Sequence, residues 1–525
     1  MMKQLPIGIQ SFIKLIKRDY LYVDKTELIK SIIETIPYCF LSRPRRFGKS
    51  LILSTIKEIF AGNRELFKDL YIYDKIQWTP YPIIHIDMLG FGSQTEMELR
   101  NNLSAHLDDI ARDFKIPIDT NRDCASKLKL LIKELYVKHK REVVILIDEY
   151  DKPILDHLEN SIVAEKNRDF LRNFYSVLKS SDEFIHFVFI TGVSKFTRTS
   201  IFSNLNNLTD ISLQSEYATL AGYTQEELEY YFAQYIEDSS LKLKISKEEC
   251  LDKIKSWYNG YSWDGVRSVY NPFSILNFFH NGDFYNYWYE TGTPTFLVKR
   301  IKDKAVYLPS FEKIKTNKNA FETWDIDNIE ITSMLFQAGY LTIKEKLPIS
   351  ENSDEHMFIL SYPNKEVTKS FLEHLYKDYT GNDISQNLTR LLRLKTAIQN
   401  DKMEDFFIEI RSLFASIPYN IFISDKEAYY HTIIYLTLRL ADITILSEIE
   451  TNIGRIDALI ETSEFIYILE FKIGTSEDAM NQIKEKSYYE SFISTGKKIL
   501  LIGIGFNEEE RNISEPVLDY FENVK

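Results

Sequence analysis

The stretch YCFLSRPRRFGKSLILSTIKEIF, residues 38–60, has the pattern of a strand, a basic loop and a helix. Gly48-Lys49-Ser50 stands where the loop turns into the helix. A helix N-terminus offers free N–H groups and the positive end of the helix dipole, both of which suit a polyphosphate. Lys49 would reach the terminal phosphates, Ser50 would ligate Mg²⁺, and Gly48 would let the backbone approach without a Cβ.

The phosphate-loop pattern is incomplete, because Arg43 stands where its first glycine is expected. Taken alone, the segment is also explained as a basic turn that caps a helix. Arg45 and Arg46 are either phosphate contacts or solvated charges. The predicted nucleotide contacts in this segment are Arg45, Arg46, Phe47, Gly48, Lys49, Ser50 and Leu51.

Short β-branched runs alternate with helical stretches between residues 38 and 213, which is typical of an α/β fold with a parallel sheet covered on both faces. The expected strands are Tyr38–Ser42, Pro82–Met88, Val143–Ile147, Phe184–Ile190 and Asp210–Leu213.

The third of these runs, VVILIDEYDKP at residues 143–153, ends in two adjacent acids. At the carboxyl edge of a parallel sheet, Asp148 would hold Mg²⁺ and Glu149 would polarise the water that attacks the γ-phosphate. Two acids at a strand end are also compatible with simple solvation. The order of the two motifs in one expected sheet favours the nucleotide site.

The fourth run, FIHFVFITGVSKFTRT at residues 184–199, ends in polar residues. Thr191 and Ser194 would contact the γ-phosphate or the attacking water. Arg198 would act as an arginine finger, within the chain or on a neighbouring subunit. A surface ion pair explains Arg198 at least equally well.

Four of these motifs, RPRRFGKS, IDEYDKP, ITGVSKF and YVDKTELI (residues 22–29), together resemble the predicted AAA-ATPase-like family of bacteria and archaea, and the match continues through WYNGYSW and VYNPFSILNFF. The resemblance implies a P-loop NTPase (ASCE/AAA-like) core at residues 1–215, a helical lid at 216–300, and ATP with Mg²⁺ as ligands. The family itself tolerates arginine at the first loop position. Asn271-Pro272 resembles a lid position that touches nucleotide, although an ordinary helix N-cap explains it equally well.

The remaining chain is expected to hold a helical, winged-helix-like middle segment at 301–425 and an αβββαβ domain at 426–525. The middle segment has one predicted strand pair, near Tyr340–Ile343 and Met357–Ser361. The C-terminal elements are expected at Glu427–Leu440, Ile443–Ile449, Arg455–Glu461, Phe465–Phe471, Ser476–Phe492 and Lys497–Ile504.

Asp457 lies on one of these C-terminal strands, and Glu470 and Lys472 lie two residues apart on the next. Paired acids bind Mg²⁺ and clamp a phosphodiester, and a lysine orients the attacking water. With the αβββαβ order, the set resembles a PD-(D/E)XK nuclease site. Alternating charge on a strand is also typical of a solvated face.

Three further residues fit the same interpretation of the C-terminal domain. Glu427 would add a metal contact from the preceding helix. Gln482 resembles a glutamine that joins some sites of this kind, with Tyr488 or Tyr489 as its partner.

The composition limits the class of protein. The 525 residues carry 64 basic and 77 acidic side chains, a net charge of -13, which excludes coating of nucleic acid by bulk charge but not a local basic patch. Cys39, Cys124 and Cys250 are too far apart for a disulfide framework. The nine histidines do not cluster with acids in the sequence, so no zinc site is expected. Without a signal peptide or membrane span, a cytoplasmic protein with no membrane partner is expected.

The leading hypothesis is an ATPase coupled to an Mg²⁺-dependent nuclease, with ATP and DNA or RNA as partners and a homo-oligomer left open. One alternative is a STAND-like nucleotide-gated switch with slow turnover and a non-cleaving C-terminal domain. A structural protein with relic motifs is the other.

Overall fold

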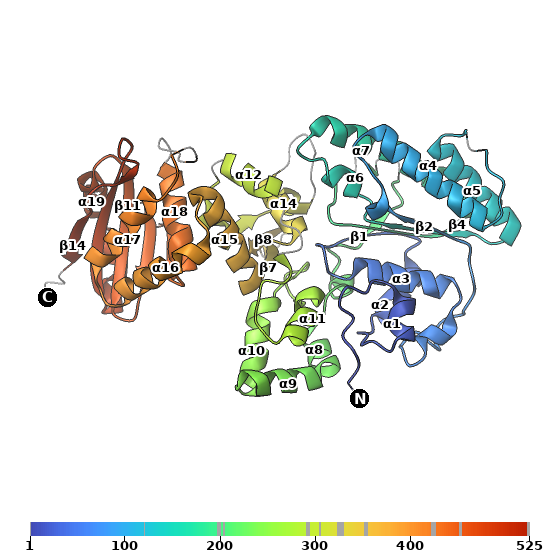
Figure 1. Ribbon diagram of the computed structural model, residues 1–525, viewed down its shortest axis with the longest axis horizontal. Coiled ribbons are helices and arrows are strands. Elements are labelled where there is room, and N and C mark those ends of the chain that lie inside the picture. Colours follow the sequence, from blue (N-terminus) through green and yellow to red (C-terminus); the bar gives the residue numbers. More distant parts are fainter. Residues whose placement is uncertain are drawn as a thin grey trace. The chain divides into compact units, whose positions relative to one another are not determined.

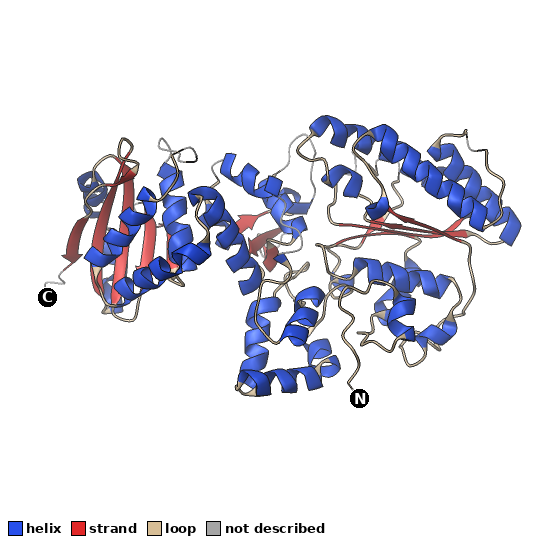
Figure 2. Cartoon of the chain, viewed as in Figure 1, coloured by secondary structure: helices blue, strands red, loops and turns tan. Residues whose placement is uncertain are grey.

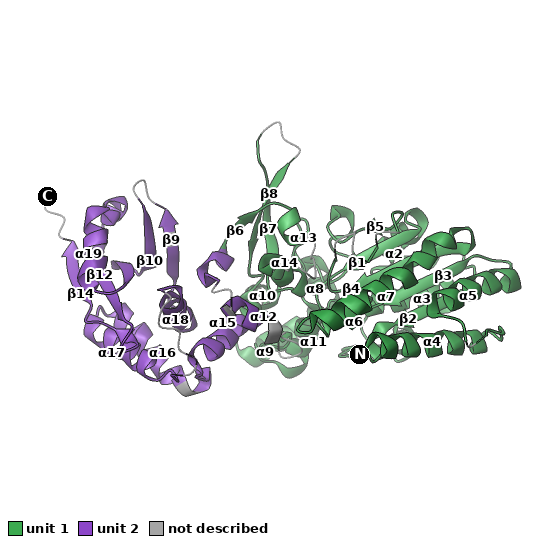
Figure 3. Cartoon of the chain, turned by 90° about the horizontal axis from the view of Figure 1, so that it is seen from above, with its two compact units in different colours: residues 1–296, 313–367 green, residues 297–312, 368–525 purple. Residues whose placement is uncertain are grey.

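The computed structural model describes residues 2–119, 121–196, 201–202, 205–289, 295–303, 306–322, 330–350, 355–419, 421, 427–450 and 454–521. The chain forms two compact units, one of residues 1–296 and 313–367, the other of residues 297–312 and 368–525 (Figure 3). The predicted domain boundaries differ from this division, which assigns residues 313–367 of the middle segment to the first unit.

A five-stranded parallel sheet forms the centre of the first unit, with the strand order β2-β3-β4-β1-β5 (Figures 1 and 2). This order places β4 between β1 and β3, so the ends of all three strands meet at one edge. Every residue of β3 is buried, as a sheet covered on both faces requires. The strands are β1 (Tyr38–Ser42), β2 (Ile83–Asp87), β3 (Val143–Asp148), β4 (Ile185–Gly192) and β5 (Thr209–Asp210).

Helices cover both faces of this sheet, with α4, α5 and α7 on one side and α1, α2 and α3 on the other (Figure 1). The predicted parallel α/β architecture is therefore confirmed. The helices are α1 (Phe12–Lys17), α2 (Thr26–Thr35), α3 (Lys49–Phe60), α4 (Glu96–Asp113), α5 (Cys124–His139), α6 (Lys152–Leu155) and α7 (Ser161–Ser180).

The expected helical lid consists of α8 (Gln225–Tyr231), α9 (Ala233–Leu243), α10 (Lys247–Tyr258) and α11 (Pro272–Asn281). Its aromatic-rich sequence builds a core in which the rings pack against one another, joined by Leu21 and Val23 from the segment before α2. The fully buried members of this core include Leu228, Phe232, Ile236, Ile254, Tyr258, Tyr270, Ile275 and Phe278.

A small antiparallel sheet of order β6-β8-β7 completes the first unit. It contains the strand pair expected in the middle segment, and its third strand was not predicted. Its elements, with the neighbouring helices, are β6 (Ile314–Thr316), α13 (Asn319–Glu322), α14 (Ile331–Ala338), β7 (Thr342–Pro348) and β8 (His356–Ser361).

The second unit contains a six-stranded mixed sheet of order β13-β12-β11-β10-β9, with β14 also paired to β12. Strands β9 to β11 are antiparallel and β12 runs parallel to β11, so the predicted αβββαβ order is confirmed. The elements of this domain are α18 (Glu427–Leu440), β9 (Ile445–Glu450), β10 (Arg455–Glu461), β11 (Phe465–Ile473), α19 (Ser476–Glu485), β12 (Lys498–Asn507), β13 (Asn512–Ile513) and β14 (Val517–Phe521).

The helix predicted at Ser476–Phe492 is shorter than expected and ends at Glu485. Ser487 has a φ of 46°, in the left-handed region that an α-helix cannot include. Residues Tyr488–Thr495 then form 3₁₀ turns.

The other helices of the second unit are α12 (Thr295–Asp303), α15 (Lys365–Thr380), of which Lys365–Val367 belong to the first unit, α16 (Ile384–Gln399) and α17 (Met403–Ala415). Among the described helices of the whole chain, none is both long and apolar enough to cross a membrane.

Candidate nucleotide and metal sites

The predicted phosphate loop lies between the end of β1 and the start of α3. Gly48 caps α3 with a φ of 89°, and a Cβ built there would meet no atom within 4 Å. Lys49 is only 4% exposed, and its Nζ donates to the carbonyl oxygens of Arg43 at 2.9 Å and Pro44 at 3.1 Å. An ammonium has three N–H donors, so the third remains for a ligand at the helix N-terminus.

A pocket of about 290 Å³ opens in front of this loop. Its walls come from five parts of the first unit: the N-terminal segment, the phosphate loop, the turn after β2, the end of β3 and the lid. The lining residues are Pro6, Gly8, Ile9 and Gln10 from the N-terminus, Arg45, Arg46, Gly48, Lys49, Ser50 and Leu51 from the loop, Leu89 after β2, Glu149 and Lys152 after β3, and Tyr223, Pro272, Phe273 and Leu276 from the lid.

The two acids that close β3 have different environments. Asp148 is 4% exposed, and the buried Thr191 hydroxyl at the end of β4 donates to its carboxylate. Glu149 lines the pocket, and its φ of 54° is a strained value for a residue with a side chain. The structure thus brings Lys49, Ser50 and Glu149 to one pocket, while Thr191 holds Asp148 in place.

Asp151 is a buried acid of this edge that the sequence interpretation missed. Its Oδ2 accepts hydrogen bonds from the backbone N–H groups of Val193 at 3.0 Å and Ser194 at 2.6 Å, and from the Ser194 hydroxyl. Burial, together with the charge of Glu149, raises the pKa of Asp151 to about 6. Ser194 is fully buried, so its hydroxyl fastens β4 to the segment after β3.

The loop arginines Arg45 and Arg46 are both exposed at the pocket. The Arg46 guanidinium lies 5.0 Å from the ring centroid of Phe273 in the lid. Phe47 is buried and packs edge-on against Tyr261 at 4.7 Å, so it anchors the loop. Arg198, the predicted arginine finger, lies outside the described residues.

Asn271 acts as an ordinary helix N-cap, the simpler of the two interpretations of Asn271-Pro272. It is fully buried and caps α11, since its Oδ1 accepts the backbone N–H groups of Phe273 at 2.9 Å and Ser274 at 3.2 Å. Pro272, the next residue, lines the pocket. The cap therefore also fixes the end of the helix that faces the loop.

In the second unit, the predicted carboxylates gather at β10 and β11. Glu470 is fully buried, and the Gln482 amide on α19 donates to its Oε1, as the resemblance implied. Among the described residues, the Oε2 of Glu470 has no hydrogen-bond partner. Asp457 accepts the backbone N–H of Phe471 at 2.9 Å. A buried carboxylate oxygen without a donor is what a metal ion would satisfy.

His431 corrects the expectation that no histidine lies among acids. Glu427, His431 and Asp457 offer ligand atoms that all lie within 4.8 Å of one another. The Nε2 of His431 makes no hydrogen bond within the part of the chain that the structure describes. Glu427 and His431 are four residues apart on α18, and this helical spacing is the sequence signal that was overlooked.

The ionisation of the carboxylate site agrees with a cation site. Burial, reinforced by the charge of Asp457, raises the pKa of Glu470 to about 8. Burial raises the pKa of Asp457 to about 6 and lowers that of His431 to about 3. A bound cation would favour the ionised carboxylates, and the imidazole is already in its neutral, ligating form.

Family models match one region in each of the two units. The model of the predicted AAA-ATPase family matches residues 6–202, and that of the PD-(D/E)XK nuclease superfamily matches residues 425–516. A protein of Azotobacter chroococcum mcd 1, described as an uncharacterized protein in the vnfD 5′ region, is 36% identical over 522 residues, covering 97% of this chain and 98% of its own. The chain is a member of the AAA-ATPase-like family with a C-terminal PD-(D/E)XK domain.

Two solved structures are also similar to this AAA-ATPase-like protein. One is the ORC2 protein of Aeropyrum pernix, in complexes with ADPNP and ADP, at 10% identity and a TM-score of 0.31, covering 68% of this chain and 95% of that one. The other is Cdc6p from Pyrobaculum aerophilum, at 12% identity and a TM-score of 0.25, covering 69% and 98%. Both TM-scores are low, so the fold assignment stands on the strand order and the family matches.

The matched ATPase region ends at residue 202, before the lid of this AAA-ATPase-like protein begins. The lid nevertheless supplies four of the pocket residues named above. The pocket is therefore built by the matched region and the lid together.

Proposed function

We propose that the protein binds and hydrolyses ATP at the pocket of the first unit, and that its C-terminal domain is a metal-dependent nuclease. The observation that carries the first part is that Gly48, Lys49, Ser50 and Glu149 line one pocket at the N-terminus of α3. The expected cytoplasmic location belongs to the same proposal, and the oligomeric state stays open.

Residues in the pocket and beside it would each carry one part of ATP hydrolysis. The helix N-terminus and Lys49 bind the phosphates of ATP. Ser50 and Asp148 would hold Mg²⁺, which neutralises charge on the phosphates. Thr191 keeps the Asp148 carboxylate oriented, and Glu149 polarises the attacking water. Arg198, if it reaches the γ-phosphate, adds positive charge there.

A substitution at Glu149 tests the ATPase proposal. Glu149→Gln should bind ATP like the wild type but lower kcat by about 10²–10⁴-fold, the usual contribution of a general base. Multiple-turnover ATP hydrolysis and retention of labelled ATP on the protein measure the two effects. Unchanged turnover in this variant would remove Glu149 from the mechanism.

The nuclease proposal rests on the carboxylate site of the second unit. Asp457 and Glu470 would hold Mg²⁺ or Mn²⁺, with Glu427 and His431 as further ligands, and the metal would stabilise charge on a phosphodiester. Lys472 orients the attacking water. DNA and RNA are the candidate substrates, since the metal and lysine recognise the phosphodiester that both contain.

Cleavage of DNA and RNA panels with Mg²⁺ or Mn²⁺ tests this second part. Asp457→Ala and Lys472→Ala should each abolish cutting, whereas Glu485→Ala, at an exposed acid near the end of α19, should cut normally. Cutting that persists in both site variants would show that another site or a contaminant is responsible.

A nucleotide-gated switch without cleavage is the second candidate function. It is favoured by the charge of residues 427–525, which hold 9 basic and 18 acidic side chains and so repel nucleic acid overall. A switch would bind ATP tightly, hydrolyse it slowly, and cut neither DNA nor RNA with any divalent metal.

A further inference from the structure

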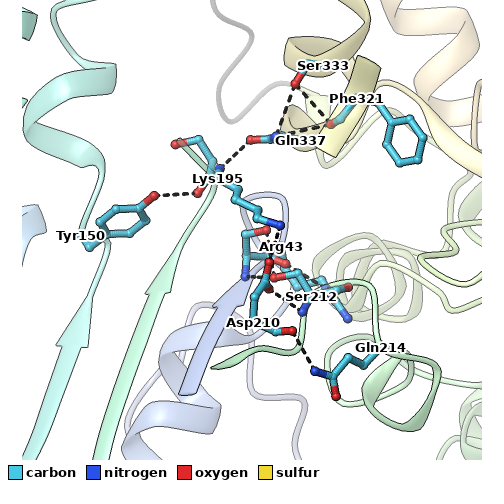
Figure 4. Close-up of polar contacts among 11 residues, drawn as sticks. Arg43, Tyr150, Lys195, Asp210, Ser212, Gln214, Phe321, Ser333 and Gln337 are labelled. Atoms are coloured by element: carbon cyan, nitrogen blue, oxygen red, sulfur yellow. Dashed lines mark hydrogen bonds and ion pairs between the residues drawn. The ribbon is translucent and has the colours of Figure 1, made fainter. Parts of the chain in front are cut away.

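Arg43 occupies the position of the missing glycine, yet its side chain does not enter the nucleotide pocket. It is 1% exposed, and its guanidinium donates to the carbonyl oxygens of Ser212 at 2.7 Å, Ser42 at 2.9 Å and Tyr217 at 3.3 Å. Figure 4 shows Arg43 beside Ser212 and Asp210. Ser212 and Tyr217 belong to the segment that leads from β5 into the lid.

The same guanidinium reaches the lid directly. It lies 4.0 Å from the ring centroid of Trp263, which is buried in the connection between α10 and α11. Trp263 in turn packs edge-on against Phe47 of the phosphate loop, at 5.4 Å between centroids. Two residues of the phosphate loop, Arg43 and Phe47, therefore pack against the same lid tryptophan.

The backbone of Arg43 belongs to the phosphate loop itself. Its carbonyl oxygen accepts the Lys49 ammonium at 2.9 Å, and its N–H donates to the Gly192 carbonyl at the end of β4 at 3.2 Å. The φ of Arg43 is outside the left-handed region, so the backbone at this position does not require glycine. A side chain is accommodated here without strain.

The segment that receives Arg43 is itself held from a second direction. The Lys195 ammonium pairs with Asp210 at 2.6 Å, and Asp210 accepts the backbone N–H of Ser212 at 2.8 Å. The Lys195 backbone N–H donates to Gln337 of α14 at 2.6 Å (Figure 4). The residues that follow β5 are thus held in place by these contacts. Arg43 can therefore position the phosphate loop by binding to them.

We infer that Arg43 is a positioning residue: its backbone holds Lys49 while its side chain ties the phosphate loop to the lid. This rests on the proposed function, because it concerns ATP at the same pocket. A guanidinium presents a planar fork of donors, and three carbonyl groups use that fork here. Restoring the glycine of the usual pattern should therefore weaken ATP binding rather than improve it.

The test compares Arg43→Gly and Arg43→Lys with the wild type in the full chain. Binding of ATP in the presence of Mg²⁺ is titrated at low temperature, where folding is verified by circular dichroism, and KM and kcat are measured separately. Arg43→Gly should bind ATP about ten-fold or more weakly, with a larger change in KM than in kcat. The ATP affinity of Arg43→Lys should lie between those of the wild type and Arg43→Gly, because lysine keeps the charge but lacks the planar set of donors.

The matched control is Arg112→Ala, at an exposed arginine near the end of α4, which should bind ATP like the wild type. If folded Arg43→Gly binds ATP within two-fold of the wild type, the inference is overturned and the arginine serves folding alone. If Arg43→Gly does not fold, wild-type affinity in Arg43→Lys overturns it. Absence of ATP binding by the wild type would instead overturn the proposed function.

Discussion

Glu366 of the first unit and Glu470 of the second are both fully buried, and burial raises the pKa of each to about 8. They differ in how their oxygens are satisfied. The Glu366 oxygens accept the backbone N–H of Trp288 and the hydroxyl of Ser274, each at 2.7 Å. Glu470 has one oxygen bonded to Gln482, and its other oxygen has no partner among the residues that the structure describes.

The difference separates a structural acid from a candidate ligand. Glu366 joins α11, which lines the nucleotide pocket, to Trp288, whose indole N–H donates to the carbonyl of Arg45 in the phosphate loop at 3.0 Å. Glu470 instead lies near Asp457, at a site where the Nε2 of His431 makes no hydrogen bond to any described residue. Burial and a raised pKa alone therefore do not indicate a metal site, whereas an unsatisfied oxygen beside other potential ligands favours one.

The largest expected effect concerns stability without metal. Glu366→Ala should lower the free energy of unfolding by about 1–3 kcal/mol for each donor that it leaves unsatisfied. Glu470→Ala in EDTA should cost less, because only the Gln482 amide loses an acceptor. Urea denaturation of the full chain measures both, with Glu237→Ala, on an exposed face of α9, as the control. Equal losses of unfolding free energy in Glu366→Ala and Glu470→Ala would contradict the distinction between a structural acid and a candidate ligand.

Added metal should affect only one of the two glutamates. A divalent ion at one hundred times its Kd stabilises a protein by about 2.7 kcal/mol. Thermal unfolding with Mn²⁺ should show this stabilisation in the wild type and in Glu366→Gln. It should be lost in Glu470→Gln and reduced in His431→Ala. If Mn²⁺ stabilised Glu470→Gln as much as the wild type, the ion would bind at a site that does not include Glu470.

The third effect is a dependence of stability on pH, which is small for each pH unit. An acid whose pKa is higher in the folded than in the unfolded chain binds its proton on folding, so stability falls as pH rises from about 4.5 to about 8. One such group contributes at most about 1.4 kcal/mol per pH unit. With saturating Mn²⁺ the Glu470 contribution should disappear, those of Glu366 and Asp151 should remain, and Glu366→Gln should reduce the slope. Urea denaturation at several pH values would contradict this if the slope were the same in that variant.

Much of the fold follows from local patterns in the sequence. The strand bounds at Tyr38–Ser42 and Arg455–Glu461 and the helix Glu427–Leu440 agree residue for residue with the structure, because periodicity and β-branched runs are local signals. The end of α19 was misjudged, since the apolar period continues past Ser487 although its backbone is left-handed.

The contacts that build the sites were harder to foresee. Arg43 contacts Ser212, Tyr217 and Trp263, which are far from it in the sequence. Patterns of residue spacing are local and do not predict such contacts. The burial of Ser194 against Asp151 was missed for the same reason. Only the pair Glu427 and His431 carried a local signal that the sequence interpretation overlooked.

Calorimetric titration of ATP in the presence of Mg²⁺ into the wild type and Lys49→Ala tests the central claim most directly. Lys242→Ala, at an exposed lysine of α9, is the matched control. The phosphate-loop account predicts saturable binding in the wild type and the control, and binding at least about one hundred-fold weaker, by roughly 2.8 kcal/mol, in Lys49→Ala. Equal affinity in all three proteins, or no binding in any, would contradict it.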